Sequence, residues 1–254
     1  MLDSGMAGHS KWKQIKRKKA VTDSRRSSVW TKCIREITVA AKAGGGDPNA
    51  NPRLRTAIDA ARAVNMPNDN IDRAIKKGTG ELEGAVYEDV TYEGYGPGGA
   101  AIFIEGTTDN PNRTVAEIRH AFNRNGGNLG AANSVAWMFD RKGQITLDAR
   151  KSAEDATLEA ALDVGAEDFA KDGDQYVVTT SPADLHAVQD GLKSKGLKIE
   201  SAELAMVPKN MVRVEGDDAI KLLKLVEMLE ELDDVSKVFS NFDVDANTLA
   251  ALEA

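Results

Sequence analysis

Residues 184–203 read DLHAVQDGLKSKGLKIESAE, and residues 218–241 repeat their pattern as DAIKLLKLVEMLEELDDVSKVFSN. Each stretch begins with apolar residues at helical spacing, passes through a short turn and ends in a run of strand length. The repeat is weak, but both copies have the same order of elements. It predicts two small α/β units of the ferredoxin-like type.

The elements around this repeat predict how the two units share the chain. Apolar patterning and turn residues predict further elements: strands at 87–93, 100–105, 134–139, 144–147, 175–180, 197–202, 210–215 and 235–241, and helices at 114–125, 152–164, 182–195 and 217–232. The first unit has only one helix before residue 134, and the last strand–helix–strand segment completes it. We therefore expect a split domain of residues 81–133 and 205–245, into which residues 134–204 are inserted as a second domain.

The first 80 residues predict a helical domain. Apolar side chains recur at steps of three and four residues in three segments, 30–41, 54–64 and 71–75. This spacing indicates three short helices, the first from about Ser27, and Asn51 followed by Pro52 marks the start of the second. Residues 1–22 contain few apolar side chains, so we expect them to stay mobile until they meet a partner. The whole chain is thus predicted to be an α+β protein with three domains.

Charge is distributed very unevenly along the 254 residues, whose net charge is −7. Residues 1–80 contain 17 Lys and Arg against 7 Asp and Glu, a net charge of +10, whereas the remainder carries −17. A basic head on an acidic body is expected when one end of a protein meets a polyanion. An uneven distribution without a function is the simpler alternative. The concentration of the excess favours residues 1–80 as a basic, helical nucleic-acid-binding domain.

The candidate nucleic-acid-binding residues follow from this charge distribution, because Lys and Arg contact phosphate without regard to sequence. They are Lys11, Trp12, Lys13, Lys16, Arg17, Lys18, Lys19, Arg25, Arg26, Lys32, Arg35, Arg53, Arg73, Lys76, Lys77 and Arg113. Trp12 is flanked by two lysines and could stack on an unpaired base. Its structural alternative is to anchor the N-terminal segment on the helical domain.

Two polar clusters in the α/β part are expected to be structural. In residues 107–114, Pro111 sets a turn, and Asn112 or Thr114 can cap the following helix. Arg113 is the exception and remains a functional candidate. Residues 125–130 are typical of a helix end followed by a loop.

We find no constellation of catalytic or metal-binding residues in the sequence. The glycine pattern at 94–99 contains Pro97 and precedes a strand-like run, so it indicates a hairpin loop instead of a dinucleotide site. Cys33 lies on the apolar stripe of a helix, and the three histidines are far apart. The acidic pairs near residues 230–234 are interpreted as the end of a solvated helix. The sequence therefore predicts a protein that is not an enzyme and has no cofactor, metal or small-molecule substrate.

The remaining composition indicates a cytoplasmic protein. No apolar run approaches the ~18 residues that a membrane-spanning helix needs, and the first residues lack the apolar core of a signal peptide. We therefore expect no membrane contact. A monomer is the default expectation for the oligomeric state.

Several ordered motifs resemble the YebC/PmpR family from residue 7 to about 242. They are AGHSKW at 7–12, REI at 35–37, AAKAGG at 40–45, NMPNDNIDRAI at 65–75, YEGYGP at 92–97 and TDNPNRT at 108–114. Two positions depart from the usual pattern. Trp30 stands where phenylalanine is common, and AANSV at 131–135 replaces a more usual PGSV.

The resemblance implies a helical N-terminal domain and two α/β domains, the last one inserted into the second. Many members of the family are described as DNA-binding transcriptional regulators. Others, including the mitochondrial translational activator of cytochrome oxidase subunit one, resemble translation factors that act on the ribosome and relieve stalling at proline-rich stretches. The resemblance implies no enzymatic activity and no cofactor.

Our leading hypothesis is a translation factor whose basic head binds ribosomal RNA, while loops 94–99 and 107–114 project into a functional centre. The basic residues are spread over a mobile segment and three helices, which suits an irregular phosphate-lined surface at least as well as a duplex groove. A regulator that binds promoter DNA is the competing hypothesis. A protein–protein adaptor with an incidental basic tail is the third.

Overall fold

Three helices form the N-terminal part of the computed structural model, which describes residues 23–244: α2 (Asp23–Gly44), α3 (Pro52–Ala63) and α4 (Asn68–Gly78). Asn51 caps α3, because its side-chain oxygen accepts the Leu54 N–H at 3.1 Å. The Asn51 amide group also donates to the carbonyl of Ala40 at 2.8 Å, which ties α3 to α2. The prediction of a three-helix domain is confirmed, although α2 begins before Ser27.

The helical domain has its own core, which explains how three short helices stay together. Ile37, Leu54, Ala61 and Ile71 are among its buried residues, and Cys33 packs against them as expected. Gly78 brings the end of α4 against α2, since a Cβ added there would lie 2.4 Å from the carbonyl oxygen of Thr38. Burial of such apolar faces supplies most of the stability of helices this short.

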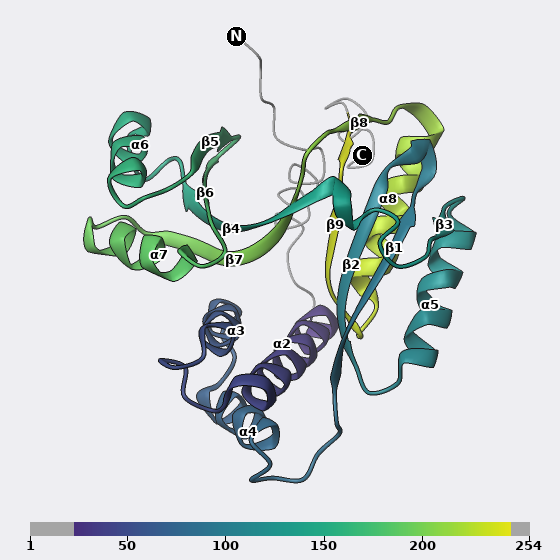
Figure 1. Cartoon of the computed structure of the whole chain (residues 1–254), viewed down its shortest axis with the longest axis horizontal. Helices are drawn as coiled ribbons and strands as arrows, with labels where there is room; N and C mark the ends of the chain where they lie inside the picture. The colour runs from purple at the N-terminus through teal and green to yellow at the C-terminus, as the bar shows by residue number, and fades with distance from the viewer. Residues whose placement is uncertain (1–22, 245–254) are drawn as a thin grey trace.

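An antiparallel sheet with the strand order β3-β1-β2-β9 forms the second domain. Its strands are β1 (Glu88–Tyr95), β2 (Ala101–Thr108), β3 (Asn128–Leu129) and β9 (Val235–Ser240). The helices α5 (Pro111–Arg124) and α8 (Gly216–Glu231) pack against one face of this sheet (Figure 1). The hairpin expected around residues 94–99 is confirmed, with the short helix η1 (Pro97–Gly99) at its turn.

The third domain lies between β3 and β9 in the chain, so the predicted insertion of one α/β domain into another is confirmed. It consists of β4 (Phe139–Asp148), α6 (Glu154–Asp163), β5 (Asp168–Asp172), β6 (Gln175–Thr180), α7 (Leu185–Ser194) and β7 (Ile199–Pro208). Its strand order, β5-β6-β4-β7, is that of a ferredoxin-like βαββαβ unit. The four strands of the second domain are arranged in the same way across their sheet. Its β1 takes the position that β6 takes in the third domain. However, β1 is the first strand of its domain along the chain, whereas β6 is the third strand of its own.

Some predicted elements differ from those in the structure. Residues 139–148 form one strand instead of two, because Gly143 continues the pairing with both neighbouring strands. The short helix η2 (Ala136–Met138) precedes it, and β5 has no predicted counterpart. The strand expected at 210–215 is reduced to β8 (Val212–Arg213), which pairs with β10 (Phe242–Asp243) outside both large sheets.

The two long strands β4 and β7 connect the inserted domain to the second domain (Figure 1). They pair with each other from Phe139 and Pro208 to Leu147 and Ile199. A separate apolar cluster includes Phe103 of β2, Phe239 of β9 and Phe139 of β4. It packs the start of the β4–β7 pair against the face of the second-domain sheet that α5 and α8 do not cover. The inserted domain is therefore held by packing as well as by its connections.

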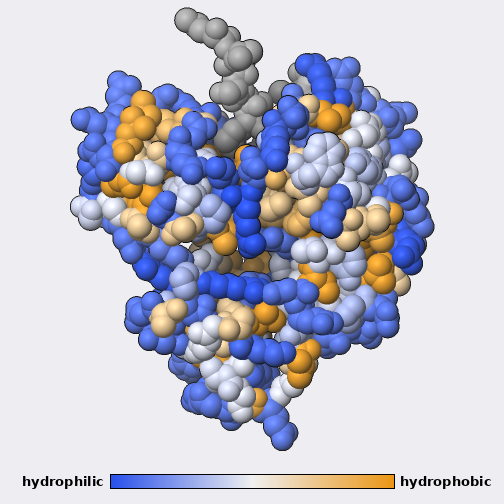
Figure 2. All heavy atoms as spheres, in the orientation of Figure 1, coloured by the Kyte–Doolittle hydropathy of each residue, from blue (hydrophilic) through white to orange (hydrophobic). Residues whose placement is uncertain are grey.

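Hydrophilic side chains cover most of the face shown in Figure 2, and a hollow lies where the three domains meet. Within residues 23–244, no helix has the length and apolarity that crossing a bilayer requires. The same part of the chain contains no cluster of three His, Cys, Asp or Glu side chains placed to hold a metal ion.

Candidate functional site

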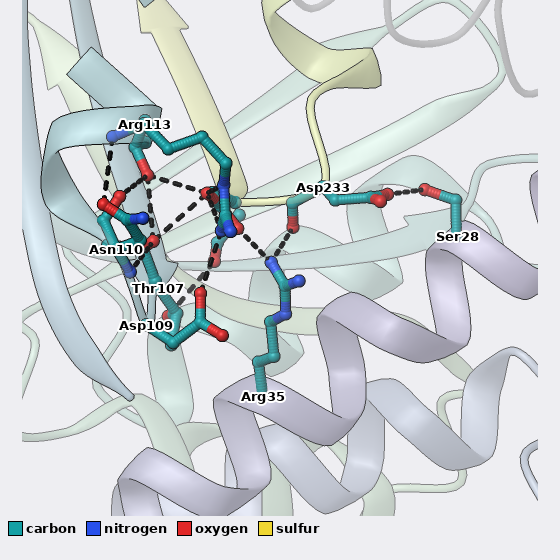
Figure 3. A network of polar contacts seen from close by, with 11 residues as sticks. Ser28, Arg35, Thr107, Asp109, Asn110, Arg113 and Asp233 are labelled. Carbon is teal, nitrogen blue, oxygen red and sulfur yellow. Dashed lines mark hydrogen bonds and ion pairs between the residues drawn. The ribbon is translucent and has the colours of Figure 1, made fainter. Parts of the chain in front are cut away.

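The polar site that we consider first is centred on Asp234, in the turn between α8 and β9. Its side chain is only 2 % exposed. A buried carboxylate is costly unless it is paired and hydrogen-bonded. The surroundings of Asp234 meet this requirement with donors from three separate elements, shown as sticks in Figure 3.

The first donors come from the segment that joins β2 to α5. The hydroxyls of Thr114 and Thr108 donate to Asp234 Oδ2 at 2.7 and 3.1 Å, and Arg113 Nη2 reaches the same oxygen at 2.7 Å. The side chain of Asn110 caps α5 by accepting the Arg113 N–H at 3.2 Å, so the expectation that Asn112 or Thr114 is the cap is wrong. The cap fixes the direction of the first turn of α5 and hence the position of Arg113.

These donors decide the charge state of Asp234. Burial alone would raise the pKa of this carboxyl, but the hydrogen bonds from Arg113, Thr114 and Thr108 and the charge of Arg35 outweigh it. The result is a pKa below the ordinary value for aspartate. Asp234 is therefore ionised at neutral pH and holds its cationic partners in place.

The second group of donors belongs to α2 and therefore to the helical domain. Arg35 Nη1 forms an ion pair with Asp234 Oδ1 and donates to the backbone carbonyl of Asp233 at 2.8 Å. Two turns of α2 share this contact: Lys32 Nζ donates to the carbonyl of Glu230 at 2.6 Å, and the Ser28 hydroxyl donates to Asp233 Oδ1 at 3.0 Å. A cation is favoured there, because Glu230 lies in the last turn of α8, where carbonyls point outward.

A pocket of about 480 Å³ opens at this junction. Its lining residues are Arg35, Arg113, Glu117, Glu231, Leu232, Asp233 and Asp234. Four carboxylates thus face two guanidinium groups, and both guanidinium groups are already paired with Asp234. The pocket is acidic overall, so its charge does not favour a phosphate.

A second contact between domains is centred on Arg53 of α3. Its Nη1 and Nη2 atoms bind both oxygens of Asp89 on β1, at 2.6 and 2.7 Å, and its Nε reaches Glu36 Oε1 at 2.9 Å. The hydrogen bond to Asp89 is the main reason why the pKa of Arg53 is raised above its ordinary value. Arg53 is therefore a fixed cation whose donors are engaged by carboxylates of the same chain.

The helical domain also touches the inserted domain. Arg55 Nη2 lies 2.7 Å from Asp190 Oδ1 on α7. Beside this pair, His186 Nε2 lies 3.0 Å from the carbonyl oxygen of Pro52 and 3.2 Å from the hydroxyl of Thr56. The helical domain is thus in contact with both α/β domains through polar groups.

The predicted binding residues fall into three groups in the structure. Lys11, Trp12, Lys13, Lys16, Arg17, Lys18 and Lys19 lie outside the described residues, and Arg25 and Arg26 belong to α2 without a described side chain. Lys32, Arg35, Arg53 and Arg113 are engaged with carbonyl or carboxylate groups of the same chain. Only Arg73, Lys76 and Lys77 remain as exposed cations with described side chains.

These three residues lie on one face of α4, because side chains three and four positions apart are neighbours on a helix. All three are exposed, and within residues 23–244 none of them forms an ion pair. Lys42, near the end of α2, is also exposed and lies beside the end of α4, since Gly78 packs against its backbone. We refer to Lys42, Arg73, Lys76 and Lys77 as the α4 face.

Two interpretations of the sequence need correction. The acidic pair at 233–234 is not merely a solvated helix end, because Asp234 is buried and joins two domains. Loop 94–99 does not project as a whole: Gly96 and Pro97 are buried, and only Gly98 and Gly99 are exposed at its turn. No local signal in the sequence distinguishes Asp234 from Asp233, since the difference arises from contacts with distant segments.

Comparisons with known proteins cover both the helical and the α/β parts. A family model described as "TACO1/YebC protein N-terminal domain" matches residues 10–81. A second model, described as "TACO1/YebC second and third domain", matches residues 87–242.

Relatives with similar sequences extend over nearly the whole chain. A protein of Gemmatimonas aurantiaca is 62% identical over 245 residues, covering 96% of this chain and 99% of its own, and a protein of Chlorobium luteolum is 52% identical, covering 98% and 100%. Both are called "Probable transcriptional regulatory protein". The crystal structure of the conserved hypothetical protein Aq1575 from Aquifex aeolicus matches with a TM-score of 0.82 and 47% identity, covering 88% of this chain and 92% of that one.

Proposed function

Because this chain belongs to the TACO1/YebC family, we propose that it regulates gene expression by binding nucleic acid with its helical domain. The observation that carries the proposal is the α4 face: its cations are exposed, whereas Arg35, Arg53 and Arg55 are neutralised by carboxylates of the acidic body. Cations that form no ion pair within residues 23–244 are available to phosphate there, and each phosphate they contact releases bound counterions.

The α4 face extends the basic character of the N-terminal segment. Residues 11–26 contain eight Lys and Arg and one acidic residue, Asp23. Together with the α4 face they supply the sequence-independent contacts that position a protein on a phosphate backbone. Residues 81–254 carry a net charge of −17 and would be repelled, so the sequence-independent phosphate contacts are concentrated at the basic end of the molecule.

We favour RNA of the ribosome as the partner. The α4 cations are clustered in the last two turns of an eleven-residue helix, and phosphate contacts made by such a cluster carry no sequence information. A cluster of exposed cations suits a folded RNA surface at least as well. The resemblance of the family to translation factors then extends the proposal to relief of stalling at proline-rich stretches, without catalysis by the protein itself.

Promoter DNA is the alternative partner, and the names of the relatives favour it. Under both alternatives we expect a cytoplasmic protein that binds nucleic acid as a monomer. Neither alternative involves a small-molecule substrate. Competition distinguishes them. We would sediment the full chain with ribosomes in the presence of excess duplex DNA and repeat the measurement over a range of salt concentrations.

Ribosome binding that survives excess DNA at physiological salt supports the translation proposal. Loss of the protein from ribosomes on addition of DNA supports the transcriptional alternative. Binding to neither, or binding that nuclease and high salt leave unchanged, would instead indicate a protein–protein adaptor. A second measurement compares translation of a message encoding a proline run with a message lacking it, and only the first should respond to the protein.

A further inference from the structure

Trp137 is the largest of the exposed apolar side chains in residues 23–244, with 65% of its surface accessible. It belongs to η2, immediately before β4, and lies far along the sequence from the α4 face. An exposed indole offers a large, rigid apolar surface for contact with a partner. The residues that hold Trp137 indicate what kind of contact this is.

Residues 131–138, which form the loop that carries Trp137, are held against β1 of the second-domain sheet. Glu93 of β1 is 6% exposed, and its carboxylate accepts the backbone N–H groups of Asn133, Val135 and Ala136 at 2.7, 2.7 and 2.8 Å. The hydroxyl of Tyr95, two residues further along the same strand, donates to the carbonyl of Ser134 at 3.0 Å. A buried carboxylate with three donors holds the loop in one conformation, so Trp137 is presented by a rigid support.

The polar edge of the Trp137 ring is already satisfied. Its Nε1 donates to the carbonyl of Ser134, within the same loop, at 3.1 Å. The remaining function of the ring is therefore contact through its faces. Stacking on a planar partner uses those faces and needs no donor.

The surface around Trp137 favours a nucleotide over a protein as this partner. The nearby exposed residues of the loop and of β4 are small or polar: Ala131, Ala132, Asn133, Asp140 and Arg141. A protein interface normally surrounds an aromatic anchor with further well-packed apolar contacts. A single base, in contrast, stacks on a single ring.

One cation lies beside Trp137 on a body that is otherwise acidic. Lys209 is fixed next to the loop, because its backbone N–H donates to the carbonyl of Met138 at 2.9 Å, and its Nζ lies 3.3 Å from Asp140 Oδ1. Cations placed next to an aromatic ring are the combination with which proteins bind single strands.

We propose that Trp137 stacks on an unpaired base of a nucleic acid strand, with half-exposed Lys209 as the nearest cation to the flanking phosphate. This site adds to the α4 face and rests on the function proposed above. It would let the second domain recognise single-stranded character, which the phosphate contacts of the α4 face cannot do.

The test compares binding of a single-stranded and a duplex oligonucleotide, each as RNA and as DNA, by fluorescence anisotropy. For Trp137→Ala we expect affinity for the single strands to fall about 5- to 150-fold, the equivalent of the ~1–3 kcal/mol that one stacked base contributes. Affinity for the duplex should not change, because its bases are already stacked. Trp137→Phe should retain most of the affinity, and Leu162→Ala, which truncates another exposed apolar residue at 60% exposure, should have none of these effects.

A spectroscopic arm reports stacking directly. In a Trp12→Phe background the remaining indoles are Trp137 and Trp30, and Trp30 is held in the helical domain by a hydrogen bond to the carbonyl of Val64. Saturation with single strand should quench the emission of this variant, and the further change Trp137→Phe should abolish the quenching.

The outcomes separate this proposal from the function on which it rests. If the wild-type chain binds both oligonucleotides and Trp137→Ala binds them equally well without any quenching, stacking is refuted and the α4 face remains. If the wild-type chain binds no nucleic acid, the proposed function fails and the stacking site fails with it.

Discussion

Arg35 and Asp234 are separated by 199 positions in the sequence, yet their side chains form the ion pair on which the helical domain rests. Asp234 also accepts hydrogen bonds from Thr108, Thr114 and Arg113 within its own domain. The same carboxylate therefore fixes the start of α5 and forms the ion pair with Arg35 of α2. Docking of the helical domain and the local structure of the second domain are coupled through this one group.

Replacement of Asp234 by alanine should destabilise the protein strongly. The change leaves the nearly buried guanidinium of Arg35 without its carboxylate partner, and loss of one partner of a buried pair typically costs about 3–5 kcal/mol. Urea denaturation of the full chain measures the difference. The control is Asp109→Ala, which removes the half-exposed partner of Arg113 and should cost no more than about 1 kcal/mol. Equal losses in the two variants would contradict the central role of Asp234.

The stability of the protein should depend on pH through the same carboxyl. Its pKa is depressed in the folded protein, while in the unfolded chain it returns to about 3.9. The stabilisation it contributes is fully present above the unfolded-state value and is lost as the pH falls through the folded-state value. We expect the difference in unfolding free energy between wild type and Asp234→Asn to be constant near pH 6 and to shrink below about pH 4. A difference that stays constant down to pH 2.5 would show that this carboxyl does not titrate as described.

Charge reversal on the α4 face should weaken nucleic-acid binding and its salt dependence together. In the triple variant Arg73→Glu, Lys76→Glu, Lys77→Glu, we expect the slope of log affinity against log salt concentration to decrease by about three, one for each lost phosphate contact. Far-UV circular dichroism should be unchanged, because these side chains are exposed.

The matched control for this variant reverses three exposed lysines of the acidic body: Lys198→Glu, Lys221→Glu and Lys224→Glu. It changes the net charge by the same amount but leaves the α4 face intact. Similar losses of binding in both triple variants would show that overall charge, and not the α4 face, determines binding.

A methyl group at position 78 should separate α4 from α2. The Cβ of Gly78→Ala would lie 2.4 Å from the carbonyl oxygen of Thr38, which belongs to the backbone of α2 and cannot move away alone. Overpacking of this kind typically costs about 1–3 kcal/mol, and we expect a corresponding fall in thermal stability. Gly84→Ala is the control, because its Cβ would meet only the movable side chain of Lys77, at 3.2 Å. An unchanged melting temperature for Gly78→Ala would contradict the close packing of these helices.

Most of the fold could be predicted from the sequence, because the residue patterns that indicate helices, strands and helix starts are local. The spacing of apolar residues revealed the helices, and Asn51 followed by Pro52 marked the start of α3 correctly. The repeat at 184–203 and 218–241 revealed the two α/β units, since each copy corresponds to one helix and the following strand: α7 with β7, and α8 with β9. Elements shorter than a few residues, such as β3 and β10, leave too weak a pattern to be detected.

The polar contacts between domains could not be predicted in the same way. Arg35, Arg53 and Arg113 are indistinguishable in the sequence from cations that face solvent. Their partners Asp234 and Asp89 become visible only when distant segments are brought together. The rigid support of Trp137 is hidden for the same reason, because Glu93 lies 40 or more residues from the amides that it accepts.

The paired strands β4 and β7 have a mechanical consequence. Any displacement of the inserted domain must twist or bend a ladder of backbone hydrogen bonds whose base is clamped by Phe103, Phe139 and Phe239. Among residues 23–244, no strand pairing joins the helical domain to the α/β domains: residues 79–87 connect it to them, and polar contacts hold it. A load applied between the two ends of the molecule would therefore be transmitted elastically by the inserted arm, whereas the basic end would yield first. The half-exposed pairs of Arg53 and Arg55 would weaken further as ionic strength rises.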